Sequence, residues 1–164
     1  MTAAGAVAQL PVVVDALPAE HLFDMQVNLQ PAQVIATAVG LRMTFIATGG
    51  ALVGPRLTGE ILPGGGDWLI VGDDGTGRID VRATIRSDDG ALIHYETRGI
   101  IKIPTGGMDR LAAGEVLPFA ETYIRTTPRF ETADSRYAWL SELVAIGYNV
   151  LSPNRVDYRI YRVL

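Results

Sequence analysis

Residues that favour tight turns recur along this chain at short intervals. Glycine and proline, often beside aspartate, mark such places from Gly49-Gly50 to Ser152-Pro153-Asn154. Between them lie runs of about 6–12 residues rich in valine, isoleucine, threonine, tyrosine and phenylalanine. Strands bounded by turns at this spacing are typical of sandwiches and barrels. The 164 residues are enough for one domain with its own core. We therefore expect an all-β fold, a single-domain antiparallel β-barrel with one or two short helices.

The runs between the turn signals predict the individual elements. The expected strands are His21–Leu29, Gly40–Thr48, Ala51–Leu62, Trp68–Val71, Arg78–Arg86, Ala91–Lys102, Glu121–Thr127, Leu143–Val150 and Val156–Val163. Helical turns are expected at Met108–Ala113 and at Ser135–Glu142, where Asp134 or Ser135 could cap. Residues 1–20 are interpreted as an N-terminal arm and residues 21–164 as the barrel domain.

The segment from Arg78 to Lys102 predicts a hairpin with a defined register. A type I turn over Asp88 and Asp89, followed by a left-handed Gly90, pairs Ser87 with Ala91. In this register Ile85, Ala83 and Val81 face Ile93, Tyr95 and Thr97. On the other face Thr84, Arg82 and Asp80 meet His94, Glu96 and Arg98. A two-residue turn at Asp89-Gly90 would mix arginines with apolar residues, so we reject that register.

The charged face of this hairpin allows two interpretations. It could be a solvated outer surface, as most charged faces are. Alternatively, Asp80, Arg82, Glu96 and Arg98 could lie in the lumen or mouth of a barrel. There the arginines would hold an anionic substrate and Glu96 would move protons.

Composition excludes several classes of function. A net charge of −4 argues against a nucleic-acid partner. The chain has no cysteine and its histidines, His21 and His94, are too few for a typical catalytic metal site. No nucleotide-binding glycine motif is present, so we expect neither a metal nor another cofactor. No stretch approaches the roughly 20 apolar residues of a membrane span. Met1–Leu17 lacks the basic start of a secretory signal, so we expect a cytoplasmic protein with no membrane partner.

Two further clusters contain candidate functional residues. Tyr123, Arg125 and Thr127 share one face of a strand, which could be a binding wall or an exposed sheet edge. Asp67 and Trp68 follow the loop Gly64-Gly65-Gly66. Asp67 could cap this loop, or act as a general base if burial raises its pKa.

Several of these motifs together resemble a known family. They are Gly54-Pro55-Arg56-Leu57-Thr58-Gly59-Glu60, Pro63-Gly64-Gly65-Gly66-Asp67-Trp68, Asp80-Val81-Arg82, Asp88-Asp89-Gly90-Ala91-Leu92-Ile93, Arg98-Gly99, Tyr123–Thr132 and Tyr137-Ala138-Trp139-Leu140. From about Leu22 to Leu164 the chain resembles the DUF3237 family, also called UPF0311. It departs from the pattern at Ser141, where asparagine is expected. The resemblance implies a small antiparallel barrel and favours the interpretation in which the charged ladder belongs to a pocket. Some members look like enzymes that act on an aromatic hydroxylamine such as 4-hydroxylaminobenzoate.

We expect a cofactor-free lyase, isomerase or hydratase acting on an aromatic or secondary-metabolite substrate. The candidate catalytic residues are Asp67, Glu96 and Tyr123, and the candidate substrate-binding residues are Arg56, Trp68, Arg82, Tyr95, Arg98, Arg125 and Trp139. Two alternatives stay open, a non-catalytic small-molecule carrier and a structural domain that uses Tyr123–Arg129 as a subunit edge. A homo-oligomer, dimeric or larger, is compatible with all three.

Overall fold

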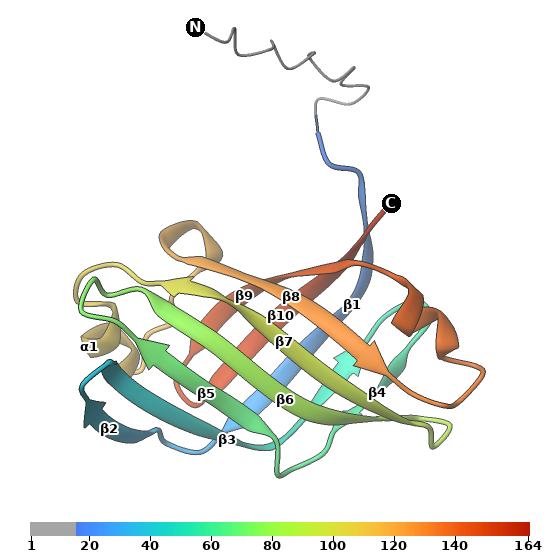
Figure 1. The fold of residues 1–164 in the computed structure, drawn as a ribbon, viewed down its shortest axis with the longest axis horizontal. Helices are drawn as coiled ribbons and strands as arrows, with labels where there is room; N and C mark the ends of the chain where they lie inside the picture. The colour runs from blue at the N-terminus through green and yellow to red at the C-terminus, as the bar shows by residue number, and fades with distance from the viewer. Residues whose placement is uncertain (1–15) are drawn as a thin grey trace, which may run out of the picture.

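The computed structural model describes residues 16–164, which form one antiparallel sheet closed into a barrel (Figure 1). The strands are β1 (Ala19–Leu29), β2 (Gln33–Thr37), β3 (Gly40–Val53), β4 (Thr58–Ile61), β5 (Gly66–Val71), β6 (Gly77–Ser87), β7 (Leu92–Lys102), β8 (Tyr123–Glu131), β9 (Ala145–Ser152) and β10 (Arg155–Val163). One α-helix, α1 (Gly107–Ala112), and two 3-10 turns, η1 (Phe119–Glu121) and η2 (Ala138–Glu142), complete the fold. The predicted fold class is confirmed.

The barrel closes where the first strand of the described chain, β1, pairs with the last strand, β10. β1 pairs antiparallel with β10, from Ala19 opposite Val163 to Asn28 opposite Arg155. The same strand pairs on its other side with β3, so the sheet has no gap there. From β10 the sheet runs through β9, β8, β7 and β6, and returns to β3 through β4 and β5.

The β6–β7 hairpin has the predicted register. Asp80 is opposite Arg98, Arg82 is opposite Glu96, and Ala83 is opposite Tyr95. Gly90 has φ 90°, the left-handed conformation that the predicted turn requires. The alternation in the sequence becomes an alternation across the wall: the apolar residues point inward and the charged residues point outward.

The core is the barrel interior. Its largest fully buried side chains include Phe23 and Met25 from β1, Ile85 from β6, Ile93 from β7 and Ile160 from β10. Each comes from the inward face of its strand, so one apolar core holds the whole wall together.

Some predicted boundaries are wrong. Gly49-Gly50 does not end a strand, because β3 continues through both glycines to Val53. A Cβ on Gly50 would lie 2.0 Å from the carbonyl oxygen of Gln26, so glycine is needed there for the close approach of β1. The expected strand Ala51–Leu62 is instead interrupted between Val53 and Thr58.

The helices and the N-terminal region also differ in detail. The first predicted helix matches α1 closely, whereas the second is the short 3-10 turn η2 and has no side-chain cap. Residues 1–15 of the predicted N-terminal arm lie outside the described residues, and β1 begins at Ala19. None of the helices within residues 16–164 is long and apolar enough to cross a lipid bilayer.

Candidate functional site

Asp67 is the one candidate catalytic carboxyl that the fold places toward the barrel interior. It lies near the start of β5, opposite Phe45 of β3 and Val81 of β6. Val81 is buried on the inward face of β6, and cross-strand partners point to the same side of a sheet. The next residue, Trp68, points outward and is 37% exposed. Strand alternation therefore separates these two adjacent candidates.

The β5–β6 ladder is interrupted beside Asp67. The pairs Asp67–Val81 and Ile70–Arg78 flank a stretch in which the two strands are not paired. In that stretch the backbone N–H of Asp80 donates to Asp67 Oδ1 at 3.1 Å. The carboxyl group thus replaces a strand hydrogen bond, which fixes its position in the wall.

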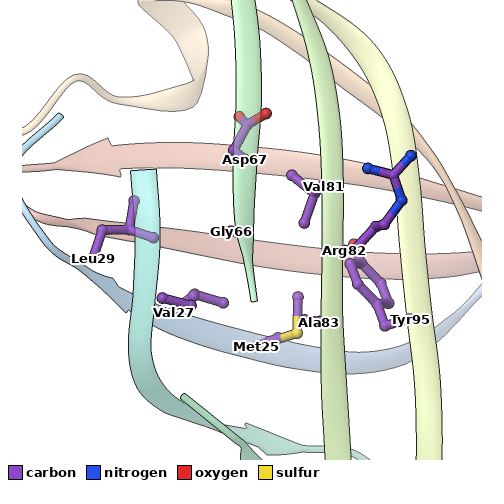
Figure 2. A pocket seen from close by; sticks show the side chains of 10 residues that line it. Met25, Val27, Leu29, Gly66, Asp67, Val81, Arg82, Ala83 and Tyr95 are labelled. Atoms are coloured by element: carbon purple, nitrogen blue, oxygen red, sulfur yellow. The ribbon is translucent and has the colours of Figure 1, made fainter. Parts of the chain in front are cut away.

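Asp67, Arg82 and Tyr95 are the ionisable residues that line a cavity in the barrel, which Figure 2 shows from close by. Leu29 and Val27 lie at one side of the view and Tyr95 lies at the other. The complete lining is Met25, Val27, Leu29, Ala47, Gly66, Asp67, Val81, Arg82, Ala83 and Tyr95. The enclosed space is about 20 Å³, room for about one water molecule. The wider hollow, including its opening to solvent, is about 310 Å³. The enclosed space is therefore far smaller than a typical small-molecule site, which spans roughly 300–1,000 Å³, and a substrate has to enter through the open side of the hollow.

The surroundings of Asp67 change its protonation. Burial raises the pKa of Asp67 to about 6, which outweighs the lowering caused by the hydrogen bond from the Asp80 backbone. The charge of Asp80 raises the pKa further. A carboxyl with a pKa of about 6 is present in both protonation states near neutral pH, as a general acid or base requires.

Two buried tyrosines lie within electrostatic reach of Asp67. Burial raises the pKa of Tyr95 and of Tyr158 well above the usual value, and the charge of Asp67 adds to both effects. Each phenol is therefore a neutral hydrogen-bond donor at physiological pH. The Tyr95 hydroxyl lies beside the Thr97 hydroxyl, a neighbour that lowers its pKa in part, and no well-aligned hydrogen bond satisfies either group among the described residues. Buried polar side chains without a partner are uncommon in folded proteins.

Further buried polar atoms of the wall are also without a partner in the described part of the chain: Thr97 Oγ1, Thr126 Oγ1 and Asn149 Oδ1. Thr97 is opposite Val81, and Asn149 is opposite Tyr158. The interior is therefore apolar with a few free hydrogen-bonding groups. None of these residues was predicted as a site residue, although the hairpin register already put Thr97 on the apolar face.

The charged hairpin face lies on the outside of the barrel wall, which agrees with the first of the two interpretations, a solvated outer surface, and not with a place in the lumen. Arg82 and Arg98 pair with Asp80 at 3.4 and 3.8 Å, and the Arg98 side chain is 74% exposed. Glu96 is on the same outer face, opposite Arg82. The reason is that the other hairpin face carries the apolar residues that fill the interior.

The remaining predicted site residues are also away from the cavity. Tyr123 is 53% exposed on the outer face of β8. The Arg125 guanidinium lies 4.4–4.8 Å from the ring centres of Phe119, Tyr123 and Tyr148. Arg56 stacks over Trp139 at 3.8 Å, between the β3–β4 connection and η2. Of the predicted site residues, the structure thus brings Asp67, Tyr95 and Arg82 to the cavity lining, and Arg82 also belongs to the charged outer face.

A second hollow lies on the outer face of β7 and β8. It encloses about 170 Å³ and is lined by Glu96, Thr97, Arg98, Thr127 and Arg129. Its charged groups are exposed to water, which screens their fields. Within residues 16–164, no three histidine, aspartate or glutamate side chains gather in a way that could hold a metal ion.

The family model for DUF3237, described as a protein of unknown function, matches residues 18–163. The chain belongs to the DUF3237 family. A UPF0311 protein of Clostridium acetobutylicum is 30% identical over 146 residues, which cover 88% of this chain and 92% of that protein. The predicted family membership is confirmed.

Solved structures of DUF3237-like proteins have the same fold. A conserved protein of unknown function from Rhodopseudomonas palustris is similar with a TM-score of 0.86 at 26% identity, covering 92% of this chain and 100% of that one. A beta-barrel like protein of Acinetobacter baumannii is similar with a TM-score of 0.76 at 32% identity, covering 91% and 97%. The barrel is thus shared by proteins that have diverged widely in sequence.

Proposed function

We propose that this DUF3237 protein is a cofactor-independent enzyme that transfers a proton to or from a small, largely apolar substrate, with Asp67 as the general acid–base. The observation that carries the proposal is a carboxyl with a pKa of about 6 in the wall of an apolar cavity. A positioned acid–base group of this kind contributes roughly 10²–10⁴-fold to a reaction rate.

Tyr95 supports the same chemistry as a neutral donor. Its hydroxyl is buried beside the Thr97 hydroxyl without a well-aligned hydrogen bond, and Tyr95 lines the cavity together with Asp67. A preorganised donor in a site with little water stabilises negative charge that develops on a substrate oxygen. Asp67 and Tyr95 would then have the complementary roles of moving a proton and of holding an oxygen.

The lining favours a substrate with an apolar body and few polar groups. The cavity wall consists mainly of Met25, Val27, Leu29, Val81 and Ala83 side chains. An aromatic hydroxylamine is our specific candidate, and its ring would have to widen the enclosed space, which now has room for about one water molecule. In that case the protonated Asp67 would deliver its proton to the hydroxylamine oxygen, and the N–O bond would break with loss of water. A second water molecule would then add to the cationic ring and return a proton to Asp67. A more distant neighbour, an enzyme from Penicillium herquei, has a similar fold (TM-score 0.64, 23% identity), so this barrel is compatible with catalysis.

The test measures binding and turnover with substituted benzoates, including 4-hydroxylaminobenzoate. Thermal shift and native mass spectrometry report binding, and chromatography reports conversion. We expect conversion without added cofactor, and a loss of roughly 10²–10⁴-fold in kcat/KM for Asp67→Asn. The matched control is Glu96→Gln, which makes the same carboxyl-to-amide change on the outer face and should leave turnover intact.

The pH profile distinguishes the proposed role from a structural one. kcat/KM of the wild type should show an inflection near pH 6, because Asp67 titrates there, and Asp67→Asn should lack it. Ligand binding without conversion would instead favour a carrier. Equal turnover of Asp67→Asn and the wild type would refute the assignment of Asp67.

A further inference from the structure

Strand β2 leaves one edge of the sheet free. Among residues 16–164 it pairs only with β3, from Gln33 opposite Thr44 to Thr37 opposite Gly40. The other strands continue the closed wall, whereas β2 lies beside β3 as an extra strand at the lower left of Figure 1. All of its residues are exposed. Its second edge therefore presents backbone N–H and C=O groups that another strand could bind.

The side chains of this edge are apolar rather than protective. Val34 and Ile35 are 54% and 57% exposed on opposite faces of β2, and Val39 in the following turn is 69% exposed. From Gln33 to Leu41 the chain has no charged residue and no proline. Natural edge strands are usually guarded by lysine, proline or a bulge, and β2 has none of these.

We propose that β2 is a self-association site, at which it pairs antiparallel with β2 of a second copy of this chain. A two-fold axis through Ile35 gives the longest overlap, with Gln33 opposite Thr37 and Val34 opposite Ala36 of the other copy. The two sheets then become continuous, and the isoleucines of the two copies meet at the axis. A two-fold contact is self-complementary, so one strand supplies both halves of the interface.

Charge favours a second copy as the occupant. Because β2 is uncharged, its self-pairing puts no like charges opposite each other, a situation that would weaken a strand pair. The nearest charged residue along the chain is Arg42, which is opposite Ile35 within its own hairpin. Its counterpart in the second copy would be three strand spacings away, about 14 Å. That distance exceeds the screening length of about 8 Å at physiological salt.

The subunit edge expected from the sequence is less open than β2. Tyr123–Arg129 belongs to β8, which pairs with β7 along its whole length and with β9 at Arg125 and Thr126. The middle of that segment is therefore covered on both sides, whereas β2 has one unpaired edge along all of its residues among residues 16–164. The β2 proposal does not depend on the proposed function, because β2 contributes no residue to the lining of the barrel cavity.

The test is sedimentation velocity of the full chain over a concentration series. The wild type should show a reversible monomer–dimer equilibrium. Ile35→Lys should weaken self-association by roughly tenfold or more. The change removes an isoleucine that the dimer would bury, and it puts two lysines opposite each other. The control Val144→Lys changes another exposed apolar residue, 68% exposed outside β2, and should leave the equilibrium unchanged. Thermal unfolding of each variant checks that the fold is intact.

Charge reversal tests the identity of the occupant. Ile35→Glu alone should also weaken the dimer, whereas a mixture of Ile35→Lys and Ile35→Glu should form a heterodimer that neither variant forms with itself. A wild type that stays monomeric, an Ile35→Lys variant that dimerises normally, or a mixture that fails to associate would each overturn the proposal. In the first case the free edge would serve a strand from a different protein.

Discussion

At the scale of single residues, Asp67 shows how neighbouring positions acquire different chemistry. Asp67 and Trp68 are adjacent, but one lies in the cavity wall and the other is on the outer face. Asp67 was predicted as a candidate base because it follows a loop beside a tryptophan. Glu96 is a candidate because charged residues lie opposite it. The same charged face lies outside the barrel, because the apolar face of the hairpin fills the interior. The local sequence pattern therefore predicted both Asp67 and Glu96 as candidates. Only the closed barrel shows that Asp67 faces the interior and Glu96 faces the outside.

The raised pKa of Asp67 predicts a pH-dependent cost in stability. Its folded pKa is about 6 and the reference value is 3.8, so the folded state binds the proton more tightly. Stability of the wild type should then fall as the pH rises from about 4 to about 6, and above that range the cost is about 2–3 kcal/mol. Asp67→Asn removes this titration and can still accept the bond from the Asp80 backbone.

We therefore expect Asp67→Asn to be more stable than the wild type by about 2–3 kcal/mol near pH 7.5, and close to it near pH 4. Urea unfolding at the two pH values measures the difference. Asp73→Asn, which makes the same change at an exposed residue of the β5–β6 turn, is the matched control. A stability gain for Asp67→Asn that is equal at both pH values would contradict the raised pKa.

At the scale of elements, what is predictable from sequence depends on how local the pairing is. The β6–β7 register followed from one turn and one alternation, both contained in about 25 contiguous residues. The role of Gly50 could not be found in this way, because the backbone that approaches it belongs to β1. β2 was missed since its residues are all exposed and show no alternation. The sequence thus predicted the hairpin correctly. It did not predict where strands that are distant along the chain pair with one another.

Gly50→Ala tests this explanation of the β1–β3 joint. The new Cβ would lie 2.0 Å from the carbonyl oxygen of Gln26, and a backbone group cannot move aside as a flexible side chain can. We expect a loss of about 1–3 kcal/mol or more in the free energy of unfolding, measured with urea. Gly72→Ala is the control, because its nearest neighbour is the Asp74 side chain at 3.0 Å. Equal effects of the two changes would show that β1 does not need glycine at that position.

At the scale of the whole molecule, the barrel is closed by residues from the two ends of the described chain. β1 pairs with β10, and the backbone N–H of Leu164 donates to the carbonyl oxygen of Pro18 at 3.0 Å. Pairings this distant along a chain form late, because a long loop must be closed before they contribute. The stability of the fold should therefore depend more on the order of the strands in the wall than on the position of the chain ends.

Circular permutation tests that conclusion. A permutant that joins Leu164 to Met1 and opens the chain between Asp74 and Gly75 keeps every strand pair, because the new ends lie in the β5–β6 turn. Its main loss is the turn hydrogen bond from Gly75 to Gly72. We expect it to unfold in one cooperative transition and to retain the circular dichroism spectrum of the wild type.

The matched permutant opens the chain between Tyr95 and Glu96, inside β7. This cut divides a strand that pairs with both β6 and β8. It also makes Tyr95, which lines the cavity, the end of the chain. We expect it to lose the cooperative transition, because two ladders and the core residue Tyr95 are disrupted together. Similar unfolding curves for the two permutants would mean that core packing alone stabilises the barrel wall and that an unbroken β7 is not required. A failure of the Asp74–Gly75 permutant alone would mean that the β5–β6 turn is needed to start folding.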